Sequence, residues 1–305
     1  MRNALPLPTR RVLLTVICLV TTLGGCSESR NPDTHRRPIA TLTHERIERC
    51  SSEPLKKALY AIQQGGDVNA TIPEADGGTV LHLLADDAYA APELLQALLD
   101  LKADPSAQDS SGHTPLHKIA RETRRKEKRG AMIFRFIAPD LMKLLLENGA
   151  KPNTPDSSGN TPLHEAAEHG KLKCAQLLLD HKAAVNSKNA SSDTPLHLAL
   201  ARLSEEFDKE MVELLLDRGA DPRAKGKGSQ SPIYVTVQAF KSNLGLDIKE
   251  VREVIELLIN KGANPAEEQA ALKLWKSISD LEENDQKDWE AVVKLLDGTE
   301  AAPGT

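Results

Sequence analysis

The segment 161–194, TPLHEAAEHGKLKCAQLLLDHKAAVNSKNASSDT, is the shortest complete copy of a unit that recurs along the chain. It begins and ends on a threonine, and the two threonines are 33 residues apart. The opening motif Thr-Pro-Leu-His occurs again at 114–117 and 194–197, and weaker forms occur at 79–82 (TVLH) and 231–234 (SPIY). Self-similarity at this period predicts a solenoid of stacked repeats, because one unit of this size cannot bury its apolar face alone.

Each part of the unit has a local physical role. Threonine is a preferred N-cap residue, and proline at the first helical position costs no hydrogen bond. A leucine-rich segment at helical spacing follows, and a Gly-Ala-Asp-like turn ends it. Such segments occur at 98–105, 144–152, 177–185, 214–222 and 257–265. The pattern therefore predicts two helices per unit, with turn signals such as DSSG at 109–112 before the next unit.

The combination of Thr-Pro-Leu-His, a leucine-rich helix and a Gly-Ala-Asp-like turn resembles the ankyrin repeat. This resemblance implies an all-α ankyrin-repeat solenoid of helix-turn-helix units with finger loops, comprising about five full repeats plus helical caps. It also implies that the motif histidines bond to neighbouring loop backbone, and that the protein binds other proteins through its finger tips and first helices.

The chain is expected to divide into a signal peptide (1–25), a lipidated cysteine with a flexible tether (26–40), an ankyrin-repeat domain (41–298) and a disordered tail (299–305). Within the domain, the expected parts are an N-terminal cap (41–70), the repeats (71–265) and a C-terminal helical cap (266–298). Terminal units need a polar outer side, which the charged, amphipathic segment 266–298 supplies. In the N-terminal cap, Ser52 is the expected N-cap of a helix with Pro54 in its first turn.

The N-terminal segment has the features of a secretory signal. Three arginines precede a short apolar stretch at 12–23, which is too short for a permanent membrane span. The ending Leu23-Gly24-Gly25-Cys26 resembles the bacterial lipobox, which implies lipidation of Cys26, and Ser27 suggests sorting to the outer membrane. We therefore expect a periplasmic protein that contacts membrane through its lipid anchor only. The alternative is an ordinary cleaved signal followed by a chance cysteine.

Charge excludes one class of partner. Because only three arginines and no acidic residues precede Ser27, the remainder carries 36 Lys and Arg against 44 Asp and Glu, a formal charge of −8. A nucleic-acid binder would need a basic footprint, so we expect none. Beyond the signal segment only Cys50 and Cys174 remain, and the repeat spacing predicts that they are too far apart for a disulfide.

The sequence offers little for catalysis, and we expect a protein that is not an enzyme and has no cofactor or metal. Motifs for dinucleotide, phosphate, zinc-protease or serine-hydrolase chemistry do not occur. The motif histidines His82, His117, His164 and His197 recur once per unit, whereas zinc ligands converge on one point. His164 and Glu165 with Glu168 and His169 could form a small acid–base cluster, but the sequence indicates no nucleophile beside it.

Insertions distinguish the units from one another. The surplus residues of the longer units all fall between the motif and the leucine-rich segment, which places them at the tips of the helix pairs. The largest insertion holds six basic and two acidic residues at 121–129 and then the run 131–137, which is apolar except for Arg135, before Pro139 opens the next helix. A solvated helix is the plain interpretation, and a partner contact is the functional one. Aromatic residues at or near the helix-pair junctions support the second: Tyr89, Phe134, Phe136, Phe207 and Phe240.

The candidate partner-binding residues fall into three groups. The insertion contributes Arg121, Arg124, Arg125, Lys128, Arg129, Phe134 and Phe136. By resemblance, the finger loops contribute Ser110, Ser111, His113, Ser157, Ser158, Asn160, Ala190, Ser191 and Asp193. By the same resemblance the first helices contribute Lys118, Glu165 and Leu198, with weaker equivalents at Leu83, Lys227, Gln230 and Val235.

Two functions remain open. The first is an immunity protein that neutralises a periplasm-acting toxin such as a secreted phospholipase effector, because the small ankyrin lipoproteins of Gram-negative bacteria that this chain resembles include immunity proteins. The second is an auxiliary factor for an envelope enzyme or for oxidative-stress defence. Both roles require a protein partner, and the sequence does not separate them.

Overall fold

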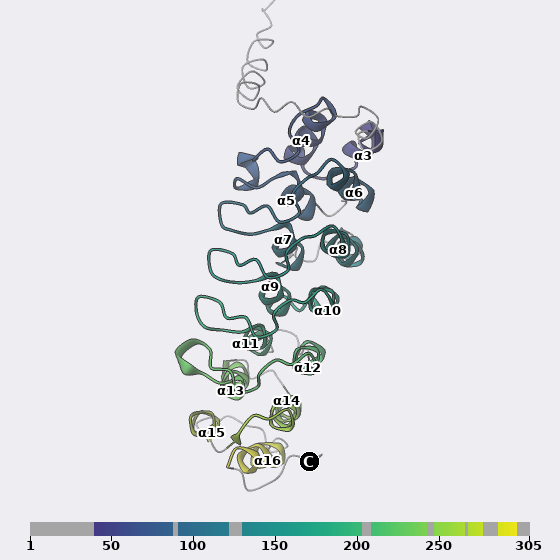
Figure 1. Ribbon diagram of the computed structural model, residues 1–305. Coiled ribbons are helices and arrows are strands. Elements are labelled where there is room, and N and C mark those ends of the chain that lie inside the picture. Colours follow the sequence, from purple (N-terminus) through teal and green to yellow (C-terminus); the bar gives the residue numbers. More distant parts are fainter. Residues whose placement is uncertain are drawn as a thin grey trace, which may run out of the picture. The chain divides into compact units, whose positions relative to one another are not determined.

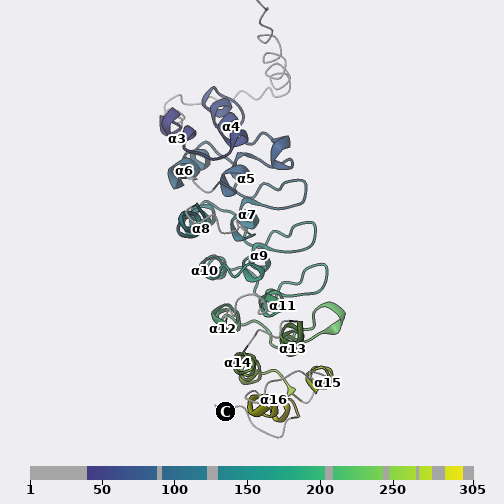
Figure 2. The same ribbon diagram turned by 180° about the vertical axis from the view of Figure 1, so that it is seen from behind.

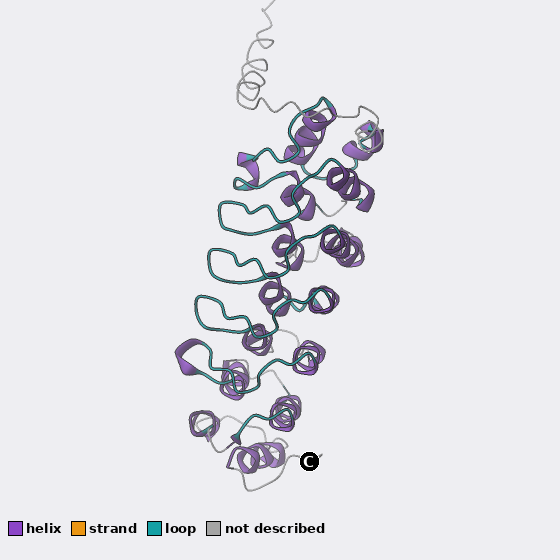
Figure 3. Ribbon diagram, in the orientation of Figure 1, coloured by secondary structure: helices purple, strands orange, loops and turns teal. Residues whose placement is uncertain are grey.

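The computed structural model describes residues 40–87, 91–121, 130–202, 209–242, 247–265, 268–276 and 286–297. The chain divides into two units, Met1–Arg37 and Pro38–Thr305, and all described residues belong to the second. Within the described ranges the structure is helical, without a strand, as the sequence predicts (Figure 3). None of the described helices combines the length and the apolar character that crossing a membrane requires.

The repeats form two layers of helices (Figures 1 and 2). The first helices of successive repeats contact one another in one layer: α5 (Val80–Ala85), α7 (Pro115–Arg121), α9 (Pro162–Glu168), α11 (Pro195–Ala201) and α13 (Pro232–Ser242). The second helices form the other layer: α6 (Pro92–Asp100), α8 (Gly130–Glu147), α10 (Leu172–Asp180), α12 (Lys209–Asp217) and α14 (Ile248–Asn260). The all-helical solenoid of helix-turn-helix units is therefore confirmed.

Further helices lie at the two ends of the stack. Before the first repeat are α3 (His44–Glu48) and α4 (Glu53–Gln63), and after the last are α15 (Gln269–Lys276) and α16 (Gln286–Asp297). Two short 3₁₀ helices, η1 (Pro73–Ala75) and η3 (Lys227–Ser229), lie in finger loops. Ser52 caps α4 through a hydrogen bond from the Leu55 N–H to its side-chain oxygen, as predicted.

The core lies between the two layers, and the motif leucine supplies one buried side chain per repeat. Leu81, Leu116, Leu163 and Leu196 are fully buried, and Ile233 takes the same place in the last repeat. Second helices contribute leucines such as Leu98 and Leu178. Because every repeat covers the apolar face of its neighbour, the core is continuous along the stack.

The motif histidines link each repeat to the next, as the resemblance implies. In each, Nδ1 accepts a hydrogen bond from the backbone N–H of the motif threonine, at 2.9–3.2 Å. Because Nδ1 is an acceptor, the proton of the neutral ring lies on Nε2, which donates to a carbonyl of the following finger. The four accepting carbonyls belong to His113, Asn160, Asp193 and Gln230. We call this series, His82, His117, His164 and His197, the histidine ladder.

Burial in the ladder favours the neutral ring. Desolvation lowers the pKa of all four histidines and brings that of His117 to about 4. A proton on Nδ1 would also face the threonine N–H, which cannot accept it. The ladder is therefore a set of structural hydrogen bonds made by neutral imidazoles.

The finger loops are joined by backbone hydrogen bonds. The N–H of Ser157 donates to the carbonyl of Ser111 at 2.9 Å, and the N–H of Ala190 donates to the carbonyl of Ser158 at 2.9 Å. This close approach requires glycine at the finger tip. A Cβ on Gly112, which has φ +77°, would lie 2.9 Å from the backbone nitrogen of Ser157.

Two features differ from, or extend, the sequence expectations. Helix α8 begins at Gly130 and runs through Pro139, so Pro139 does not open it. A proline inside a helix removes one N–H donor and crowds the carbonyl four residues earlier, which can bend a helix without ending it. Cys50, after α3, and Cys174, in α10, are both buried free thiols, and desolvation raises their pKa values to about 11 and about 12.

Candidate functional site

The finger tips form the exposed part of the first-helix side of the stack (Figures 1 and 2). The side chains at the tips are exposed in three successive fingers: Ser110 and Ser111, Ser157 and Ser158, Ala190 and Ser191. Their backbone is held from within each finger as well as between fingers. Asp156 Oδ1 accepts the N–H groups of Ser158 and Asn160 at 2.8 Å, for example. These tips are therefore surface side chains on a fixed backbone.

Other predicted contact residues are only partly exposed and have partners in the fold. Asn160 links neighbouring fingers, because its side-chain oxygen accepts from Asn189 Nδ2 at 2.9 Å. Lys118 Nζ lies 2.9 Å from Asp109 Oδ2, an ion pair between α7 and its own finger. Asp193 Oδ1 accepts the Lys227 N–H of the next finger at 2.8 Å. These side chains stabilise the fingers as well as lining the face.

A groove of about 260 Å³ lies between α11 and α13 on this face. Its lining includes five of the residues that the repeat motif marks as contact positions: Asp193, Leu198, Lys227, Gln230 and Val235. The structure adds Ala201 and Gln238 from the exposed turns of the two helices. The divergent last repeat therefore contributes Lys227 and Gln230 to the same groove, whereas Val235 is buried and differs from the surface contact that the motif predicts.

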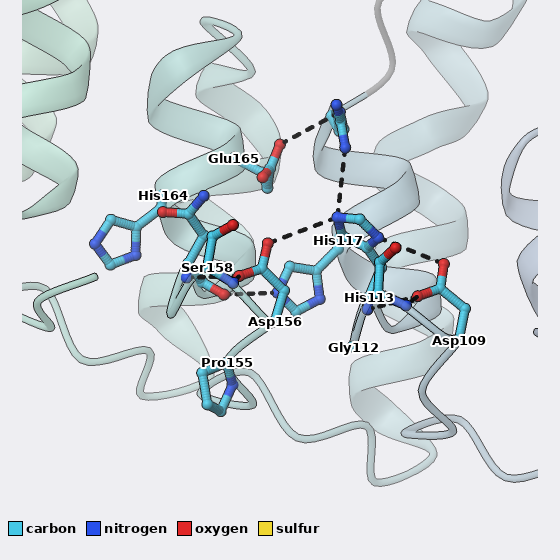
Figure 4. Close-up of polar contacts among 12 residues, drawn as sticks. Asp109, Gly112, His113, His117, Pro155, Asp156, Ser158, His164 and Glu165 are labelled. Carbon is cyan, nitrogen blue, oxygen red and sulfur yellow. Dashed lines mark hydrogen bonds and ion pairs between the residues drawn. The ribbon is translucent and has the colours of Figure 1, made fainter. Parts of the chain in front are cut away.

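A polar cluster crosses from the second repeat to the third (Figure 4). His113 lies between the aspartates of two successive fingers. Its Nδ1 is 3.4 Å from Asp109 Oδ2, and its Nε2 is 3.6 Å from Asp156 Oδ2. Burial opposes ionisation of Asp109, but Lys118 and the backbone N–H groups of His113 and Ser111 outweigh it and hold the pKa of this carboxyl below its usual value. The cluster therefore contains a fixed negative charge beneath the finger.

Glu165 of α9 and Arg121 of α7 complete this cluster. Arg121 Nε is 3.9 Å from Glu165 Oε2, and its Nη1 is 3.4 Å from His113 Nε2. The side chain of Glu165 is only 5 % exposed, whereas that of Arg121 is 53 % exposed. Burial raises the pKa of Glu165 to about 7. This position differs from the surface contact expected for Glu165, because the packing of α7 against α9 covers its carboxylate.

The acid–base cluster expected around Glu165 forms only in part. Glu165, Glu168 and His169 come together, and His169 Nδ1 lies 3.8 Å from Glu165 Oε2. His164 does not join them, because its ring faces the finger and bonds to Thr161 and Asp193. Adjacent residues on a helix point in different directions, so His164 and Glu165 cannot share one site.

The insertion is the part of the predicted interface that lies mostly outside the described residues. Arg124, Arg125, Lys128 and Arg129 lie outside the described residues, as do Tyr89 and Phe207. Phe134 and Phe136 belong to α8, but their side chains are outside the description. Phe240 is not a contact residue: it is buried and stacks on Trp275 with ring centroids 5.3 Å apart. Phe240 lies near the end of α13, where its ring packs in the core against α15.

The sequence pattern did not indicate Asp109 and Asp156 as parts of a site. It marked both as turn residues, and each does accept finger N–H groups through Oδ1. The second carboxylate oxygen of each faces His113, a residue that the pattern did mark. The signal available in advance was the combination of a finger aspartate with a histidine four residues later, since both lie in one turn.

The comparison with known families agrees with this geometry. A family model described as ankyrin repeats, in three copies, matches residues 132–226. These residues run from α8 into the finger loop before α13. No curated protein gives a significant match to the chain. Residues 132–226 are thus similar to ankyrin repeats, and proteins built from ankyrin repeats typically serve as binding scaffolds.

Proposed function

We propose that this protein is a non-catalytic scaffold that binds another protein through its finger tips and first helices. One observation carries the proposal: three successive fingers present exposed, small polar side chains on a backbone that hydrogen bonds hold in place. A fixed backbone lowers the entropy that is lost on binding. The groove between α11 and α13 extends the same face and offers apolar contact area.

A more specific version of the proposal adds a location, a lipid anchor and a kind of partner. The protein is lipidated at Cys26, lies in the periplasm on the outer membrane, and acts as an immunity protein against a periplasm-acting toxin such as a secreted phospholipase effector. The lipobox-like residues 23–26 and the ankyrin repeats support this version. A lipid anchor would hold the protein where such a toxin acts. An auxiliary role beside an envelope enzyme is the alternative.

The basic insertion is the proposed main contact. Arg121, Arg124, Arg125, Lys128 and Arg129 would suit an acidic cleft, with Phe134 and Phe136 filling its apolar part. Reversing Arg124, Arg125, Lys128 and Arg129 to Glu should leave thermal stability unchanged and abolish capture of the partner. Retained capture would show that the insertion is only a solvated segment.

Photo-crosslinking tests the proposed face directly. A crosslinkable residue at Ser158 should give an adduct with the partner in the envelope fraction. The matched control is Lys173, an exposed residue of α10 in the second-helix layer, where no adduct is expected. Equal adducts at both positions, or an adduct at Lys173 alone, would contradict the proposed face.

Two cellular experiments test the more specific version. Cys26→Ala should release the protein from the membrane fraction into the soluble periplasm, and unchanged fractionation would refute lipidation. For immunity, cells that lack the protein should die when the crosslinked partner is delivered to their periplasm, and the wild-type chain should rescue them. Survival without the protein, together with reduced activity of the partner, would favour the auxiliary role.

A further inference from the structure

We propose that His113, Asp156 and Glu165 form a binding site for a divalent transition-metal ion of the zinc type. The site lies between the second and third repeats, under the finger loops (Figure 4). The proposal is independent of the proposed function, because metal binding is measured on the chain without any partner.

The three side chains offer a suitable donor set at nearly the right separation. One imidazole nitrogen and two carboxylate oxygens all lie within 4.8 Å of one another. In a tetrahedral zinc site, metal–ligand bonds of about 2.0–2.2 Å place ligand atoms about 3.3 Å apart. The separation between His113 Nε2 and Asp156 Oδ2 is 3.6 Å, so a small movement of side chains brings the set together.

Two of the ligands are already oriented by their surroundings. Asp156 Oδ1 accepts two backbone N–H groups, which leaves Oδ2 directed at His113. On the far side of the ring, His113 Nδ1 is buried, makes no hydrogen bond within the described residues, and lies 3.4 Å from Asp109 Oδ2. A metal-bound histidine commonly directs its other N–H at a carboxylate, which fixes the ring and raises its basicity. Asp109 is placed to act in this way when Nε2 binds a metal.

The third ligand is a buried carboxylate that lacks a close partner. The carboxylate of Glu165 accepts no hydrogen bond from the described residues, and among them the closest arginine or lysine nitrogen is Arg121 Nε at 3.9 Å. A carboxylate with so little exposure is costly unless a cation compensates it. Arg121 is half exposed, so its guanidinium can turn towards solvent and leave this position to a metal ion.

The neighbouring group Glu165, Glu168 and His169 is a weaker alternative. His169 Nδ1 already contacts the carbonyl of Glu165 at 3.0 Å, and Glu168 is exposed. In the proposed site, by contrast, every ligand residue is at least partly buried, and His113 Nε2 lies 3.6 Å from Asp156 Oδ2. Glu165 is common to both groups, so variants of His113 and His169 distinguish them.

The test is a titration of the untagged, full-length chain with Zn²⁺ by calorimetry, after treatment with a chelator. We expect one equivalent to bind and to raise the thermal midpoint, because a ligand of the folded state stabilises it. Glu165→Gln and His113→Gln should each weaken binding at least tenfold. His44→Gln, at an exposed histidine of α3, and His169→Gln should leave it unchanged. Arg121→Gln should bind as tightly as wild type or more tightly.

Several results would overturn the proposal. These are no stoichiometric binding by the wild type, binding by Arg121→Gln alone, or binding that His44→Gln weakens as much as Glu165→Gln. Loss of binding in His169→Gln but not in His113→Gln would move the site to the alternative group. If Glu165→Gln does not fold, Asp156→Asn takes its place, since it keeps the side-chain oxygen that accepts the finger N–H groups.

Discussion

The middle repeats and the C-terminal end of the stack join their neighbours by different chemistry. In the middle, His117, His164 and His197 donate to a carbonyl of the following finger. In the last repeat, Ser231 and Tyr234 replace the threonine and the histidine. Ser231 Oγ donates instead to the buried carboxylate of Glu268, and Phe240 stacks on Trp275 of α15.

The difference follows from the element that packs beside each repeat. A ladder histidine needs a finger carbonyl from the next repeat, and among the described residues α13 is followed by the helices α15 and α16 rather than another finger. At this end, the hydrogen bond from Ser231 to Glu268 and the stacking of Phe240 on Trp275 join the last repeat to the helices that follow it. The solenoid therefore keeps its apolar core throughout, whereas the polar link from one repeat to the next depends on which element follows that repeat in the stack.

The largest effect should come from the aromatic pair at the end. Trp275→Ala removes a fully buried indole from the contact between α13 and α15, and such truncations cost about 3–5 kcal/mol of unfolding free energy. Because repeats contact only their neighbours, hydrogen exchange should increase in α13 to α16 and stay slow in α7 to α10. Uniformly faster exchange would show that the end is not an independent link.

Breaking the ladder should affect the middle of the stack instead. His164→Ala leaves the buried Thr161 N–H and the partly buried Asp193 carbonyl without their partner. Each buried unsatisfied group costs about 1–3 kcal/mol, so we expect a loss of about 2–5 kcal/mol in denaturant unfolding. The control His181→Ala, at a residue after α10 outside the ladder, should change stability by less than about 0.5 kcal/mol.

Acid should weaken the middle more than the end, because the ladder stops before Tyr234. Burial holds the ladder pKa values below the ordinary 6.5, and that of His117 at about 4. At a pH between the folded and the unfolded pKa of a ladder histidine, the unfolded chain binds a proton that the folded chain does not. The free energy of unfolding therefore decreases as pH falls from about 6.5 towards 4. For His117 alone the loss reaches about 3 kcal/mol. Denaturant unfolding at pH 7.5 and pH 5, with exchange measured by segment, would detect it.

Glu165 should have the opposite pH dependence. Its folded pKa of about 7 lies above the ordinary 4.5, so the folded state holds a proton and stability is lost as pH rises from 4.5 through 7. Glu165→Gln removes this loss. With a chelator present, the variant should be more stable than wild type at pH 8 by about 1–3 kcal/mol, and similar to it at pH 4. A variant less stable than wild type at pH 8 would show that the carboxylate has a partner that it needs.

The smallest effect should come from the finger tips. Replacing Ser111, Ser158 and Ser191 together by Arg should change unfolding free energy by less than about 0.5 kcal/mol per site, because all three side chains are exposed. Partner capture should be lost, since three long cations would cover the proposed face. Marked destabilisation, measured in the same denaturant experiment, would mean that the side chains support the fold.

Much of this molecule was predictable from the sequence because its determinants are local. The Thr-Pro-Leu-His motif defines a helix start within four residues, and the buried leucine and the bonded histidine occupy the positions that the motif implies. The finger tips were predictable for the same reason, since DSSG at 109–112 specifies a turn wherever it occurs. The end at α15 and α16 was indicated by its amphipathic pattern, although the pairing of Phe240 with Trp275 was not.

Contacts between repeats were decided only by the tertiary structure. His113 and Glu165 belong to different repeats, and no spacing rule within one repeat reveals that α9 brings a carboxylate to the imidazole of the preceding finger. The burial of Glu165 also depends on how α7 packs against α9, because a position on a first helix is exposed or covered according to its neighbour's side chains. The sequence by itself determined the repeat and its caps through local capping and periodicity. The tertiary stack alone decided which polar groups meet and how far they are removed from water, and so where the candidate metal site lies.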